Sequence, residues 1–150
     1  MTDFFLPSDI KEIAEALGGE AQVFTGKTVM LTGGRGFLGR YFTEVFVHLN
    51  EAVLKEPCKV VVLDNLITAG KEGANMGDRP NATFIEHDVT IPLDWDEDVH
   101  FIIHAAGIAS PFYYRKYPLE TLEVAITGTR NMLVLAERHQ ARLVFFSSSE

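Results

Sequence analysis

A short run of glycines follows the first apolar segment of the sequence. Gly33, Gly36 and Gly39 lie three residues apart, directly after the run 28–31. Glycine suits positions where the chain turns tightly, where backbone amides approach a phosphate, and where a helix packs closely on a strand. The free amides and the positive dipole end of the following helix would face the anion. The spacing predicts a loop that binds the pyrophosphate of a dinucleotide, although an ordinary strand-to-helix turn also uses glycine.

A second apolar segment ends in an acidic residue. Residues 59–63 are short and β-branched, which is typical of a buried parallel strand, and Asp64 follows them. A carboxylate ~20 residues or a little more beyond the glycine loop would accept hydrogen bonds from an adenosine ribose. Its charge would repel a ribose phosphate, which favours NAD over NADP. Arg35 keeps NADP open as an alternative, because its guanidinium could pair with that phosphate. It could also lie solvated beside the pyrophosphate.

The elements that must position these residues alternate along the chain. We predict strands at 27–32, 59–63, 82–86, 99–104 and 142–147, helices at 37–50 and 118–139, and a glycine-rich loop at 68–80. This order predicts an α/β fold, a Rossmann-type doubly wound parallel sheet. The long helix is expected to face the sheet with one apolar stripe, made of Leu122, Ile126, Thr129, Leu133 and Ala136.

Residues 1–26 form an extension before the first strand. A short helix is expected from Asp9 to Leu17, with Asp9 and Glu12 as a capping box and Gly18 ending it. Its apolar stripe would lie on the core or bind a partner. Residues 27–150 form the dinucleotide-binding domain, which we expect to be incomplete, because a buried parallel strand normally continues into a crossover helix. The sequence thus predicts the amino-terminal part of a longer enzyme that lacks its carboxyl-terminal substrate region.

Composition narrows the classes of function. The 150 residues are 47% hydrophobic and carry a formal net charge of −8, which argues against nucleic-acid or anionic-membrane binding. The single cysteine, Cys58, offers neither an internal disulfide nor a metal cluster, and we expect it to be a buried apolar filler. No export signal and no membrane span is recognisable, so we expect a soluble, cytoplasmic protein without a metal site.

Several separated motifs occur in the order typical of one family. They are Thr32–Gly39, Asp64-Asn65-Leu66, His87–Leu93, His104–Pro111 with Tyr114, Pro118-x-x-Thr121-Leu122, and Gly128-Thr129-x-Asn131-Met132-Leu133. With them, residues 27–150 resemble the extended short-chain dehydrogenases/reductases. Within that group the chain looks like the NAD-dependent epimerase/dehydratase branch, and most like the UDP-glucuronate decarboxylases.

The resemblance implies a set of site residues for a tightly held NAD and a nucleotide-sugar substrate. His104 is expected to be a packed strand residue rather than a base. The pyrophosphate would lie on Gly33, Gly36, Phe37 and Leu38, the adenosine ribose on Asp64 and Asn65, the adenine beside Asp88 and Val89, and the rest of the cofactor along Ala105 and Ala106. Ser110 and Tyr114 would bind substrate, and Ser148, Ser149 and Glu150 would be catalytic, with Ser148 contacting the sugar hydroxyl that is oxidised.

The resemblance also implies a reaction. NAD oxidises the sugar C4 hydroxyl, the resulting β-keto acid loses CO2, and the hydride returns. The base would be the tyrosine of a Tyr-x-x-x-Lys motif, which these 150 residues lack, so we expect them to be inactive alone. Ser149 stands where 4,6-dehydratases carry an aspartate, which makes dehydration less expected, and Ala125 replaces a family asparagine.

Other functions stay open at this point. They are nucleotide-sugar 4-epimerisation, 4,6-dehydration, and a non-catalytic module that binds NAD. The family commonly dimerises through two helices, so the intact protein is expected to form a homodimer through the helix at 118–139 and a later helix that these 150 residues lack.

Overall fold

One parallel sheet organises the chain. The computed structural model describes residues 6–70, 76–77 and 79–147. Five strands lie in the order β3-β2-β1-β4-β5, and every neighbouring pair is parallel. The strands are β1 (Thr28–Thr32), β2 (Lys59–Asp64), β3 (Ala82–Glu86), β4 (Phe101–His104) and β5 (Arg142–Phe145). The predicted doubly wound parallel sheet is confirmed, and its strand ends differ from the predicted ones by two residues at most.

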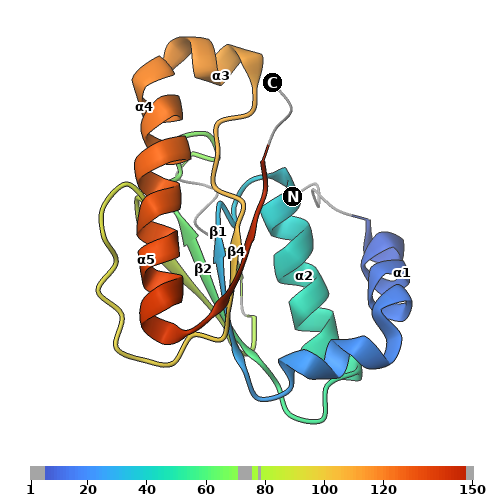
Figure 1. The fold of residues 1–150 in the computed structure, drawn as a ribbon. Coiled ribbons are helices and arrows are strands. Elements are labelled where there is room, and N and C mark those ends of the chain that lie inside the picture. Colours follow the sequence, from blue (N-terminus) through green and yellow to red (C-terminus); the bar gives the residue numbers. More distant parts are fainter. Residues whose placement is uncertain (1–5, 71–75, 78, 148–150) are drawn as a thin grey trace.

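Helices cover both faces of the sheet (Figure 1). On one face lie α1 (Pro7–Leu17), the 3₁₀ helix η1 (Gly18–Phe24) and α2 (Phe37–Ala52). They pack with one set of strand side chains, Val29, Val60 and Val62. The alternate side chains Met30, Val61 and Leu63 pack under α5 (Thr129–His139) on the other face. Since side chains alternate along a strand, β1 and β2 each contribute to two separate cores.

The amino-terminal helix begins two residues before the predicted position. Pro7 occupies its first turn, where a missing amide hydrogen costs no helical hydrogen bond, and no side chain caps it, so the predicted capping box is wrong. Gly18, with φ of 49°, ends the helix as expected. The predicted apolar stripe consists of Ile10, Ile13 and Leu17. Ile10 is buried in the core on the α2 side and Leu17 packs against that core, but Ile13 is 41% exposed, so the core interpretation is confirmed for two of the three. Cys58 is also buried, as predicted, and burial raises the pKa of its thiol to about 11.

The long helix differs most from its prediction. It consists of α4 (Pro118–Glu123), a π-helical turn η3 (Val124–Gly128) and α5. Leu122, Ile126 and Leu133 are 55%, 51% and 52% exposed, so the predicted sheet-facing stripe is wrong for these three. The face that packs on the sheet carries Val124, Gly128, Met132, Leu135 and Ala136. A short helix, α3 (Pro111–Lys116), was not predicted; it follows the loop after β4.

Candidate functional site

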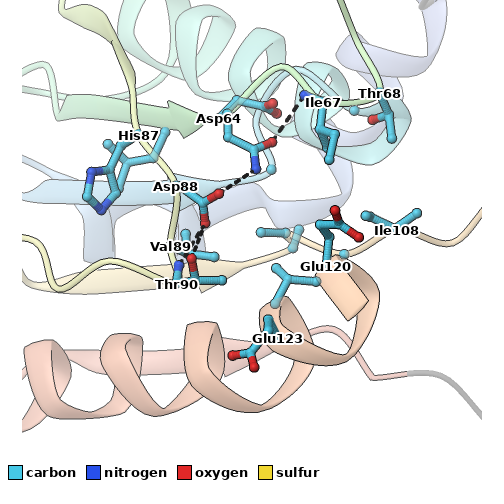
Figure 2. A pocket seen from close by; sticks show the side chains of 18 of the residues that line it. Asp64, Ile67, Thr68, His87, Asp88, Val89, Thr90, Ile108, Glu120 and Glu123 are labelled. Carbon is cyan, nitrogen blue, oxygen red and sulfur yellow. Dashed lines mark hydrogen bonds between the residues drawn. The ribbon is translucent and has the colours of Figure 1, made fainter. Parts of the chain in front are cut away.

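The carboxyl ends of the central strands meet at one crevice. In register, Thr32 of β1 pairs with Leu63 of β2 and with His104 of β4, so the loops after these strands leave the sheet side by side. The chain passes from β1 to β2 on one side and returns to β4 on the other, which makes this the point where ligands bind in open parallel sheets. A crevice of about 300 Å³ opens here (Figure 2).

Eight of the predicted cofactor residues line this crevice. They are Gly33, Gly36, Asp64, Asn65, Asp88, Val89, Ala105 and Ala106. They come from four separate loops, so their gathering depends on the strand order rather than on nearness in sequence. The structure thus brings together most of the residues for which the resemblance implies contact with one dinucleotide.

The glycine loop is packed so closely that side chains would not fit. Gly33 has φ of 69°, and a Cβ there would lie 2.6 Å from the Ala105 carbonyl oxygen. A Cβ on Gly39 would clash with the Gly33 carbonyl oxygen, and one on Gly34 with the Val62 side chain. The loop therefore lies directly against the exit of β4. The amides of Gly34, Arg35 and Gly36 already donate within the protein, so the amides in the first turn of α2 are the ones that can face a ligand. This arrangement fits the pyrophosphate of a dinucleotide.

Asp64 is held in place by backbone amides. Its two carboxylate oxygens accept hydrogen bonds from the Arg35 and Leu66 amides, each at 2.8 Å. Each oxygen keeps a second lone pair, so the carboxylate can still accept a ribose hydroxyl. The Arg35 side chain is not solvated as one interpretation had it, because it is only 8% exposed, and it does not line the crevice. Its burial, with Arg40 nearby, lowers its pKa.

A second carboxylate, Asp88, lies across the crevice from α4. Asn65 donates to one of its oxygens at 3.0 Å, and the amide and hydroxyl of Thr90 donate to the other at 2.9 and 2.7 Å. Asp88 and Thr90 are labelled in Figure 2. Partial burial alone would raise the pKa of Asp88, but these hydrogen bonds outweigh it and lower the pKa. Asn131 of α5 donates to the Val89 carbonyl at 2.9 Å and so ties this loop to the helix.

The other predicted residues lie elsewhere. The side chains of Phe37 and Leu38 line a second, largely apolar groove of about 530 Å³ between α1 and α2. Only their backbone amides, in the first turn of α2, belong to the glycine loop. Ser110 precedes α3 and Tyr114 lies within it, and neither lines the crevice. Ser148, Ser149 and Glu150 lie outside the described residues.

Sequence reasoning missed two acidic side chains of this site. Glu120 and Glu123 project from α4 on the side of the crevice opposite Asp88 (Figure 2). They are three residues apart, a spacing that places side chains on one helix face. That spacing was visible in the sequence, but only the packing of the helix shows that this face borders the crevice.

Comparison with known proteins places the chain in a family. The model of the NAD-dependent epimerase/dehydratase family matches residues 29–150. The chain belongs to this family. UDP-glucuronic acid decarboxylase 2 of Arabidopsis thaliana is 37% identical over 126 residues, which are 83% of this chain and 26% of that protein. The chain therefore spans about a quarter of this curated relative.

Solved structures of epimerases share the fold. Epimerase Mth375 from Methanothermobacter thermautotrophicus superposes with a TM-score of 0.68 at 24% identity, over 87% of this chain and 38% of that one. A UDP-glucose 4-epimerase from Stenotrophomonas maltophila, solved with bound NAD, gives 0.61 at 23% identity, over 82% and 37%. At this identity the likeness concerns the fold. Among the described residues, the structure has no helix that is both long and apolar enough to cross a membrane.

Proposed function

We propose that this chain is the NAD-binding part of a nucleotide-sugar enzyme that acts on the sugar C4 position, with UDP-glucuronate decarboxylation as its reaction. The observation that carries the proposal is the crevice at the switch point of the sheet. It joins a glycine loop without room for side chains to a carboxylate, Asp64, at the tip of the next strand. The 37% identity to a UDP-glucuronic acid decarboxylase supports the choice of reaction.

In this proposal the chain binds the cofactor and orients it toward the substrate. The amides in the first turn of α2 would hold the pyrophosphate where it lies against Gly33 and Gly36. Asp64 would hold the adenosine ribose, and Asp88 with Val89 the adenine. NAD, when bound, would supply reversible oxidation of the C4 hydroxyl, and a C4 ketone lets the C6 carboxyl leave as CO2 because the ketone takes up the bonding electrons. Ser148 would hydrogen-bond the sugar hydroxyl, as the family resemblance implies.

The direct test uses the complete reading frame with UDP-glucuronate labelled with ¹³C at C6. We expect release of labelled CO2 and formation of UDP-xylose. A UDP-galacturonate product without CO2 would replace decarboxylation by 4-epimerisation, and a 4-keto-6-deoxy product from a UDP-hexose would indicate dehydration. A protein that binds NAD but converts none of these substrates would be a non-catalytic module.

Cofactor binding can be tested separately from turnover. Asp64→Asn removes the carboxylate at the ribose, and Glu86→Gln removes an exposed carboxylate that pairs with it in the register of β2 and β3. We expect Asp64→Asn to weaken NAD binding about tenfold, because a hydrogen bond to a charged group contributes about 1.5 kcal/mol or more. NADP binding should weaken less. Calorimetry that finds equal NAD affinity in both variants would contradict the assignment of Asp64.

We further propose that the protein forms a homodimer through the outer face of α4, η3 and α5. The exposed Leu122, Ile126 and Leu133 support this, because exposed apolar side chains gathered on one helix typically mark a protein interface.

A further inference from the structure

The ring of His104 is completely buried beneath the crevice and uses both of its nitrogens. Nδ1 lies 2.6 Å from the hydroxyl of Thr32, and Nε2 lies 3.2 Å from the hydroxyl of Thr129. One ring face stacks on Phe145 of β5, with centroids 5.5 Å apart. A single side chain thus contacts three strands and a helix: its own β4, β1, β5 and α5.

The contacts of the Thr32 hydroxyl favour one arrangement of the protons. The Thr32 oxygen accepts the amide hydrogen of Ala106 at 3.3 Å, so its own single proton is available for Nδ1 of His104. In this arrangement Nδ1 is the acceptor, the ring proton lies on Nε2, and Nε2 donates to the Thr129 hydroxyl. A second ring proton would make Nδ1 a donor, so the Thr32 hydroxyl would have to turn its own proton away from the ring. Burial opposes that proton as well and lowers the pKa of His104 to about 4.

This chain of hydrogen bonds joins the segments that flank the crevice. Thr32 immediately precedes Gly33, and a Cβ on Gly33 would lie 2.7 Å from the Cα of Ala106. The Ala106 amide donates to the same hydroxyl that bonds His104. On the other side, Thr129 begins α5 directly after the π-helical turn, whose first residue, Val124, lines the crevice. His104 therefore sits where the glycine loop, the exit of β4 and the covering helix converge.

We infer that His104 is a positioning residue: a neutral ring that fixes the spacing between the glycine loop, the Ala105-Ala106 segment and α5, and so shapes the half of the crevice beyond the adenosine. The inference rests on the proposed function insofar as that crevice binds a dinucleotide. The adenosine half, which Asp64 defines at the end of β2, lies outside this hydrogen-bond chain.

The tautomer of His104 can be measured in the protein without any ligand. Nitrogen-15 spectra of the histidine rings in the wild-type protein should show His104 protonated at Nε2 and unprotonated at Nδ1, with unchanged shifts from about pH 6 to pH 8. A ring that titrates in that range, or carries its proton on Nδ1, would overturn the inference.

The binding test compares matched variants. Thr129→Val keeps the shape of the side chain but removes the hydroxyl, Thr129→Ser keeps the hydroxyl, and His104→Phe keeps an aromatic ring without nitrogens. His100→Gln is the control, because its Nδ1 accepts the Thr28 amide at 3.2 Å at the opposite end of the same strands. We expect His104→Phe and Thr129→Val to weaken NAD binding about tenfold and about threefold, and Thr129→Ser and His100→Gln to change it little.

A comparison with AMP separates positioning from general destabilisation. AMP lacks the second phosphate and the nicotinamide riboside, so we expect its affinity to fall less than about twofold in Thr129→Val. Equal losses for NAD and AMP, or wild-type NAD affinity in both Thr129→Val and a folded His104→Phe, would overturn the inference. A wild-type protein that does not bind NAD would instead contradict the proposed function, and the ring spectra would still decide the hydrogen-bond arrangement.

Discussion

The Asp88 carboxylate shows how single residues shape this site. Three hydrogen bonds from Asn65 and Thr90 favour its charged form. In Asp88→Asn, one of these donors would face an amide NH2 group. We expect this variant to be less stable at pH 7 by about 1 kcal/mol in urea unfolding, since a hydrogen bond to a charged group contributes at least that much.

The pH dependence of this stability contribution follows from the direction in which the pKa of Asp88 is shifted. The folded pKa of Asp88 is lowered, so its stabilisation is fully present above the unfolded value of about 3.9 and is lost as the pH falls through the folded pKa. The stability difference between wild type and Asp88→Asn should therefore be constant from about pH 7 to pH 5 and shrink below about pH 4. Asp98→Asn, at an exposed carboxylate, is the control. A difference that grows on acidification would contradict the assignment.

At the residue scale, the sequence predicted the parts of the site that follow strand ends. Asp64 could be predicted because it comes directly after an apolar run. Ala106 could be predicted because the family resemblance implies it at the end of another central strand, and the carboxyl ends of parallel strands share one edge. His104 was correctly expected to be a packed strand residue. Its hydrogen bonds to Thr32 and Thr129 could not be predicted, because the three residues are brought together only by the register of β1 with β4 and the seating of α5.

The loop between β1 and α2 offers a test at the scale of an element. Gly39→Ala would place a Cβ against the backbone of Gly33 and Gly34, which cannot move without shifting the strand end. Helix propensity alone would favour alanine by up to about 1 kcal/mol. We nevertheless expect a net loss of at least about 2 kcal/mol in the free energy of unfolding, because overpacking against backbone dominates.

Gly107→Ala is the matched control for this substitution. It lies beside the same crevice, and a Cβ there meets nothing within 4 Å. Its effect on unfolding should stay within about 0.5 kcal/mol. Equal thermal or urea stability of the two variants would show that the loop is less tightly packed than the structure has it.

The long helix shows why one element was predicted in place but wrongly oriented. It carries two apolar stripes at helical spacing, one through Leu122, Ile126 and Leu133, and one through Val124 and Met132. Periodicity alone cannot choose between them. Gly128 decides, because a Cβ there would lie 2.8 Å from Val89 in the loop after β3, and only the stripe that contains this glycine can approach that loop so closely.

At the scale of the whole molecule, the parallel sheet was the most predictable feature. Short β-branched runs separated by helical segments leave few arrangements other than a doubly wound parallel sheet. The added amino-terminal helix was harder to place. Its position on α2 depends on long-range contacts, such as the hydrogen bond from the Tyr41 hydroxyl to Asp9 at 3.0 Å, that no local pattern encodes.

The proposed homodimer can also be tested at the scale of the whole molecule. If the outer stripe of the long helix joins two copies, Ile126→Glu and Leu133→Glu would bury a charge at the interface of the dimer and leave the monomer fold intact, because both side chains are about half exposed. Sedimentation of the wild type should give a dimer. In either variant the dissociation constant of the dimer should be at least about tenfold higher. Val23→Glu, at an exposed apolar position of η1, should remain dimeric. A monomeric wild type at tens of micromolar, or variants that sediment like the wild type, would show that this stripe does not hold two copies together.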